Sequence, residues 1–179
     1  MTYLKYYFTF FILLVMGNRI YAQKTLQFSQ HGLNLIEMGV KLDSSIKNDL
    51  HDIDRSTGAG DIRYISLSLE NKDLIYKELS FDNYITKDIG TVENIYLGFT
   101  KDNEVKRITI VYSRNSIIQV KDILDSIFKE PKVQVQTTLN SNSAFGSTSY
   151  SSYYWSGNFG FYVNLSLVTS EIIFWFLPN

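Results

Sequence analysis

The chain has 179 residues, of which 45% are hydrophobic, a formal net charge of −1 and no cysteine. The lack of cysteine excludes disulfides, thiolate metal ligands, a cysteine nucleophile and a lipidated N-terminal cysteine. No basic patch or arm stands out, which speaks against nucleic-acid binding.

The N-terminus has the organisation of a secretory signal. One lysine in residues 1–5 precedes an apolar run over residues 6–16 (YYFTFFILLVM), and Ala22 lies just before Gln23. A charged start, a short apolar segment and a small residue at the end are typical of a cleavable signal peptide. The alternative is an uncleaved anchor, but a spanning helix needs about 20 apolar residues. We expect residues 1–22 to be removed near Ala22, and the protein to be secreted, periplasmic or in the cell envelope.

The mature chain, residues 23–179, is long enough for a single domain held together by core burial. Its first half mixes short alternating apolar runs with polar breaks and one helix-like spacing, for which Asp43 or Ser44 is the expected N-cap. The expected elements are a strand over 24–29, a turn at 31–32, a helix over 44–51, a loop over 52–61, strands over 63–70 and 74–81, and a loop over 82–91.

The clearest hairpin joins residues 93–99 and 105–112, because apolar residues alternate on both sides of a Lys-Asp-Asn turn. The best helix follows, where Ser116 and Gln119 match a capping box and Pro131 lies just beyond the end. One apolar face is formed by Ile117, Val120, Leu124, Ile127 and Phe128. A strand over 133–138 and a mobile Ser/Asn-rich connection over 140–152 complete this part.

The C-terminal aromatic run, residues 150–177, predicts three successive strands with turns at 156–158 and 168–171. In the middle strand the odd-numbered residues from Phe159 to Leu167 are apolar and share one face. The last strand, residues 172–177, is apolar on both faces, which is typical of a central or doubly covered strand.

Together these elements predict an α+β fold with an antiparallel sheet of about seven or eight strands and two helices packed on one face. A helix followed by a meandering sheet occurs over residues 32–112 and again over 113–177. We therefore expect one domain that contains two possible helix-plus-meander modules.

Residues 38–46 (MGVKLDSSI) have a glycine, a short spacer and a helix start, and residues 99–105 (FTKDNEV) form a strand–turn–strand signature. In these segments the chain resembles the tandem helix-plus-sheet modules of secreted β-lactamase-inhibitor proteins and of SmpA/OmlA-type outer-membrane assembly lipoproteins. The second half departs from that pattern, since no glycine precedes the helix at Ser116 and the Ser-rich loop is an addition. The resemblance implies a binding or assembly role rather than catalysis.

One polar cluster has partial metal-site spacing. Asp52, Asp54 and Ser56 alternate as in a calcium loop, but Thr57 and Arg63 stand where a glycine and an acidic ligand are required. Such acidic residues more often form a solvated helix end and loop. We therefore expect no cofactor and no metal, with these three residues as the weak metal candidates.

The region from Asp49 to Asp61 also carries the enzymatic alternative, an extracytoplasmic hydrolase. It would need His51 and carboxylates to converge in a pocket. The chain has no Gly-x-Ser-x-Gly elbow and no HExxH helix, and its many carboxylates suggest no catalytic pair. No catalytic residue is therefore assigned.

The aromatic residues of the C-terminal run offer the main binding hypothesis. Exposed rings give a large rigid contact area for a sugar or a protein, although most strand aromatics pack within the sheet. We expect Tyr153, Trp155 and Tyr162 to form one exposed face. The leading hypothesis is a non-catalytic binding module whose partner is an unidentified protein or glycan in the envelope or outside the cell.

Overall fold

The computed structural model describes residues 23–53, 73–80, 82–112, 117–129, 133–139, 148–156, 160–167 and 170–176. In these residues the fold is α+β, with many strands and two helices. No helix in this part of the chain is long and apolar enough to cross a membrane.

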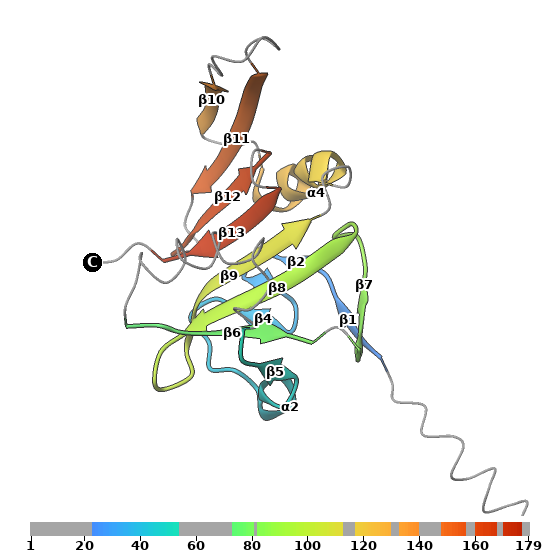
Figure 1. The fold of residues 1–179 in the computed structure, drawn as a ribbon, viewed down its shortest axis with the longest axis vertical. Coiled ribbons are helices and arrows are strands. Elements are labelled where there is room, and N and C mark those ends of the chain that lie inside the picture. Colours follow the sequence, from blue (N-terminus) through green and yellow to red (C-terminus); the bar gives the residue numbers. More distant parts are fainter. Residues whose placement is uncertain are drawn as a thin grey trace, which may run out of the picture.

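The main element is an eight-stranded sheet in the order β10-β11-β12-β13-β9-β8-β6-β5 (Figure 1). Every neighbouring pair in it is antiparallel, as the sequence predicts. Its strands are β5 (Leu50–His51), β6 (Ile75–Leu79), β8 (Val92–Phe99), β9 (Val105–Tyr112), β10 (Val133–Leu139), β11 (Thr148–Ser156), β12 (Tyr162–Ser166) and β13 (Glu171–Trp175).

The hairpin of β8 and β9 is confirmed, with Ile95 opposite Ile110 and Leu97 opposite Ile108. Its turn closes with an Asn103 N–H bond to the Thr100 carbonyl at 2.8 Å. Asn103 has a φ of 64°, which asparagine tolerates better than most residues because its short polar side chain bonds locally.

The C-terminal strands continue this hairpin rather than forming a separate sheet. β13 pairs with β9 through Ile172 opposite Ile110 and Phe174 opposite Ile108. On its other side β13 pairs with β12. The last strand is therefore central, which confirms the prediction made from its apolar composition.

One face of the sheet carries the hydrophobic core. Helix α4 (Ile117–Phe128) places Phe128 against it, with ring centroids 6.2 Å from Phe174 and 6.5 Å from Phe161. A small antiparallel sheet of β2 (Phe28–Ser29), β3 (Gly32–Leu33) and β4 (Ile36–Glu37) contacts the same face, where the Phe28 ring lies 6.1 Å from Phe174. Ile46 of α2 (Ser44–Lys47) belongs to the same core.

Two further contacts tie the N-terminal segment to distant parts of the chain. β1 (Lys24–Leu26) pairs in parallel with β7 (Tyr84–Thr86). Gly39 donates its N–H to the Val105 carbonyl at 2.8 Å, and Val105 donates to the Val40 carbonyl at 3.0 Å. The first described residues are thus held by segments far away in the sequence.

The structure corrects three of the predicted elements. The helix predicted over 44–51 ends at Lys47, because Leu50 and His51 instead pair with β6 as strand β5. The loop predicted over 82–91 contains β7, since Tyr84–Thr86 pair with β1. The connection predicted over 140–152 already belongs to β11 from Thr148 onward.

Other predictions fall on parts of the chain outside the described residues. These are the strand over 63–70, the capping residue Ser116, Pro131, residues 140–147, and most of the two turns in the aromatic run.

Candidate binding face

The register of the C-terminal strands divides their side chains between two faces of the sheet. Val163 and Leu165 of β12 lie on the core face and are fully buried. Since side chains alternate along a strand, the residues between them point to the opposite face. We call the set on that opposite face the aromatic face: Tyr154, Tyr162, Asn164, Ile173 and Trp175.

The aromatic face is built on two rows of cross-strand neighbours. Tyr162 lies opposite Trp175, and their rings stack with centroids 5.7 Å apart and planes 30° from parallel. In the next row Asn164 lies between Tyr154 and Ile173. All five residues are half-buried. Such an aromatic pair contributes about 0.5–1.5 kcal/mol beyond area burial and holds both rings in place.

The aromatic face carries no charged side chain of its own, and its polar neighbours on β11 and β12 are Ser152, Ser156 and Ser166. Glu171 is the nearest acidic residue on the same side of β13. A surface of rings, one amide and hydroxyls can bind an uncharged ligand by stacking and hydrogen bonds.

On the neighbouring strand β9, the residues on this side of the sheet are buried. Trp175 pairs with Arg107 of β9, where Arg107, Thr109 and Val111 are all buried. The Arg107 Nε–H donates to the Thr109 Oγ1 at 3.4 Å. On β9 this side of the sheet is therefore closed to a ligand.

The prediction that Tyr153, Trp155 and Tyr162 share one exposed face is wrong. Tyr153 pairs with Leu165 and Trp155 with Val163, so both point to the core face, opposite to Tyr162. Trp155 is 1% exposed. Its Nε1–H donates to the Lys129 carbonyl at 2.9 Å and to Asp125 Oδ1 at 3.2 Å, beneath helix α4.

Tyr153 is half-buried beside Trp155, with ring centroids 6.4 Å apart, and the Lys121 ammonium lies 5.1 Å from its ring. Tyr162 is the one predicted ring on the aromatic face. Sequence reasoning missed Trp175 because it lies in a strand that is apolar on both faces. The alternation of β12 was the available signal, since it separates Tyr162 from Val163.

Asp49, the first residue of the predicted catalytic region, is held in a network of its own. Its carboxylate accepts from the Tyr84 hydroxyl at 2.6 Å, from Lys24 Nζ at 2.9 Å and from Asn83 Nδ2 at 3.2 Å. Burial opposes its ionisation, but the hydrogen bonds from Tyr84, Lys24 and Asn83 outweigh it and lower the pKa of Asp49. Burial and donation to Asp49 raise the pKa of Tyr84.

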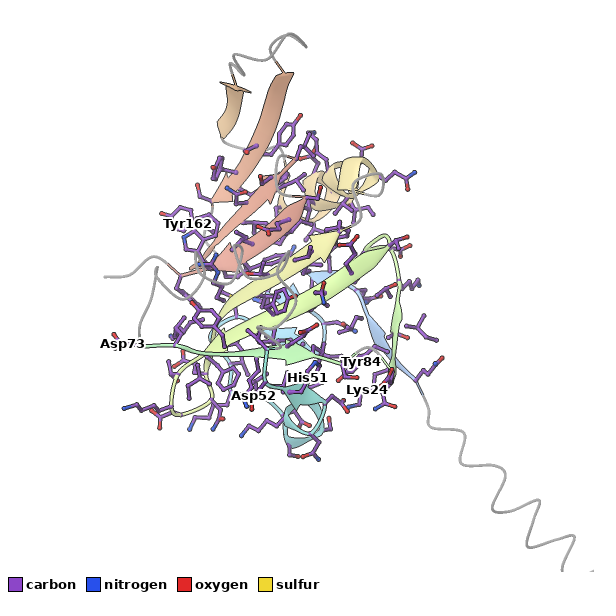
Figure 2. All side chains as sticks on the ribbon, viewed as in Figure 1. Lys24, His51, Asp52, Asp73, Tyr84 and Tyr162 are labelled. Atoms are coloured by element: carbon purple, nitrogen blue, oxygen red, sulfur yellow. The ribbon has the colours of Figure 1, made fainter. Side chains whose placement is uncertain are left out.

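The other described residues of that region have different partners. His51 Nε2 lies 3.8 Å from Glu78 Oε2, and Asp52, whose side chain is 91% exposed, pairs with Lys77 at 2.5 Å. Asp54, Ser56 and Asp61 lie outside the described residues. Figure 2 shows Tyr162 well away from His51 and Asp52.

The described residues of that region therefore do not converge on one site. Asp49, His51 and Asp52 each bind a different partner. In this part no group of three or more His, Asp or Glu residues is placed to hold a metal ion.

No family model matches this chain, and neither the curated proteins nor the solved structures include a significant match. The resemblance to helix-plus-sheet modules stays a prediction.

Proposed function

We propose that this protein is an exported, non-catalytic binding module that contacts its partner through the aromatic face. The observation that supports it best is the stacked pair of Tyr162 and Trp175, half-buried on the side of the sheet opposite the core. Rings fixed in this way offer a large contact area and lose little conformational freedom on binding.

The chemistry of the face favours a neutral glycan over a charged partner. Sugar rings present C–H faces that stack on Tyr162 and Trp175, and their hydroxyls can pair with the hydroxyls of Ser152 and Ser156 beside the face. The five residues of the aromatic face include no charged side chain that would select an anionic or cationic ligand. A protein partner is the other outcome of the test below.

The proposal includes export, on the strength of the signal-like residues 1–22 and the expected cut after Ala22. The product would act in the periplasm, the cell envelope or outside the cell. It also includes the finer architecture, in which both helices pack on one face of the sheet. The hydrolase alternative depends partly on Asp54, Ser56 and Asp61 and stays a prediction.

The test measures binding of mature residues 23–179 to neutral polysaccharides and to envelope extract. Tyr162→Ala removes one ring of the stacked pair, and Tyr153→Ala is the matched control because its ring lies on the core side of a neighbouring strand. We expect Tyr162→Ala to weaken binding about tenfold or more, since stacking on an aromatic ring contributes about 1–3 kcal/mol. Thermal unfolding confirms that both variants are folded.

Three results distinguish a glycan partner, a protein partner and a contact surface elsewhere on the protein. Glycan binding that is lost in Tyr162→Ala and kept in Tyr153→Ala supports the proposal. A protein recovered from the extract with the same dependence supports the face but makes the partner a protein. Equal binding by wild type and Tyr162→Ala would show that the contact surface lies elsewhere.

A further inference from the structure

The residue that follows the expected signal cut is Gln23. Removal of residues 1–22 would make it the N-terminal residue of the mature protein. An N-terminal glutamine has its α-amine within reach of its own side-chain amide, and a five-membered ring forms when the two react. The question is whether the fold leaves both groups free.

The folded part of the chain begins one residue later. Lys24 opens β1, and its backbone N–H donates to the Asn83 carbonyl at 2.8 Å. Its ammonium donates to Ser45 O at 3.0 Å and to Asp49 Oδ2 at 2.9 Å. These bonds fix Lys24 in the structure and leave the residue before it at the surface.

Gln23 itself is exposed. Among the described residues no hydrogen bond or ion pair involves Gln23. Its side-chain amide is therefore not held away from its own backbone nitrogen, and the terminal residue is free to adopt the ring geometry.

We propose that Gln23 of the exported protein is converted to pyroglutamate. The neutral α-amine attacks the side-chain carbonyl carbon, a C–N bond forms to close the lactam, and the original amide C–N bond breaks to release ammonia. The reaction needs no oxidant or reductant. An α-amine has a pKa of about 7.7–8.0, so a useful fraction is neutral near pH 7. This inference rests on the proposed export and on a cut after Ala22.

The modification has a structural consequence. Aminopeptidases require a free α-amine, so the lactam blocks removal of residue 23 and then of Lys24. Loss of Lys24 would remove the ammonium that pairs with Asp49 at 2.9 Å. It would also remove the first residue of the β1–β7 pairing. Cyclisation therefore protects the contact that anchors the N-terminus.

The experiment expresses the full chain in an exporting bacterial host and examines the mature protein by intact mass and N-terminal peptide sequencing. We expect a peptide that begins at residue 23, is lighter by one ammonia and does not react with amine-specific labels. Gln23→Ala is the matched control, because its side chain has no amide and cannot form the lactam. An aminopeptidase should trim this variant and leave the wild type intact.

The outcomes separate this inference from the proposed export. A peptide that begins at residue 23 with a free amine, both when fresh and after prolonged incubation, overturns cyclisation but leaves the cut in place. A mature chain that begins at another residue overturns the cut and the inference together. Protein that retains residues 1–22 overturns export by a cleaved signal.

Discussion

At the scale of single residues, Asp49 is an acidic group held by three side-chain donors. It receives hydrogen bonds from β1, from the turn before β7 and from Tyr84 within β7. Two segments, at residue 24 and at residues 83–84, thus meet at the carboxylate of Asp49. Every described partner of Asp49 is a donor that stabilises the negative charge of the carboxylate.

Asp49→Asn should destabilise the protein by about 1–3 kcal/mol, because the amide cannot accept all three hydrogen bonds and the Lys24 ammonium loses its charged partner. Chemical denaturation at neutral pH measures the free energy of unfolding. Asp52→Asn is the control, since its exposed carboxylate forms a surface ion pair and should give no measurable change. Equal effects of the two substitutions would contradict the structural role of Asp49.

The hydrogen bonds to Asp49 also predict how the stability difference between wild type and Asp49→Asn depends on pH. Because the folded pKa of Asp49 is lowered, its contribution is fully present above its unfolded pKa of about 3.9. The contribution is lost as the pH falls through the folded pKa. The gap in stability between wild type and Asp49→Asn should therefore shrink in acid, which denaturation at a series of pH values will reveal.

At the scale of elements, helix α4 is fixed to the sheet by both packing and polar contacts. Val120, Leu124 and Phe128 enter the core, as the amphipathic pattern predicts. The Trp155 indole N–H bonds the Lys129 carbonyl just beyond the end of the helix. A helix leaves its last carbonyls unpaired, so this bond from β11 satisfies one of the groups near that end.

Trp155→Phe should weaken this attachment by about 1–3 kcal/mol, because it keeps an aromatic ring but removes the donor to Lys129 O and Asp125. Thermal unfolding gives the stability change, and amide hydrogen exchange should show faster opening of α4 than of β8 and β9. Tyr154→Phe is the matched control from the adjacent position on the aromatic face, with an expected change within about 0.5 kcal/mol. Unchanged exchange in α4 would argue against the anchor.

At the scale of the whole molecule, the two predicted modules share one sheet and one core. β13 from the second half pairs with β9 from the first through five residue pairs. Phe28 and Phe128 both contact Phe174, so the core includes side chains from the start, middle and end of the chain. The repeated element order therefore does not produce two separate sheets.

The fragment of residues 23–112 should not fold by itself. Without β13 and α4 it would expose Ile108 and Ile110, which are fully buried in the full chain. We expect the fragment to lack a cooperative thermal transition and to bind a hydrophobic dye, whereas residues 23–179 should unfold in one step. A cooperative transition in the fragment would show that the modules are independent.

Local pattern was sufficient wherever the nearest neighbours in sequence decide the structure. The β8–β9 hairpin follows from alternation around a short turn, Asp43 caps α2 as predicted, and α4 follows from its apolar stripe. The antiparallel pairing of neighbouring strands follows from composition and spacing in the same way. These features depend on residues only a few positions apart, so the sequence by itself determined them.

Pairing between strands far apart in the sequence determined the features that local pattern did not predict. Leu50 and His51 lie in a strand because they pair with β6. Tyr84–Thr86 lie in a strand because they pair with β1. Trp155 was expected to be exposed, but the register with Val163 and the position of α4 place it in the core. Which face of a strand meets a helix depends on contacts between segments far apart in the sequence. Only the folded structure could therefore bring Tyr162 and Trp175 together on the aromatic face.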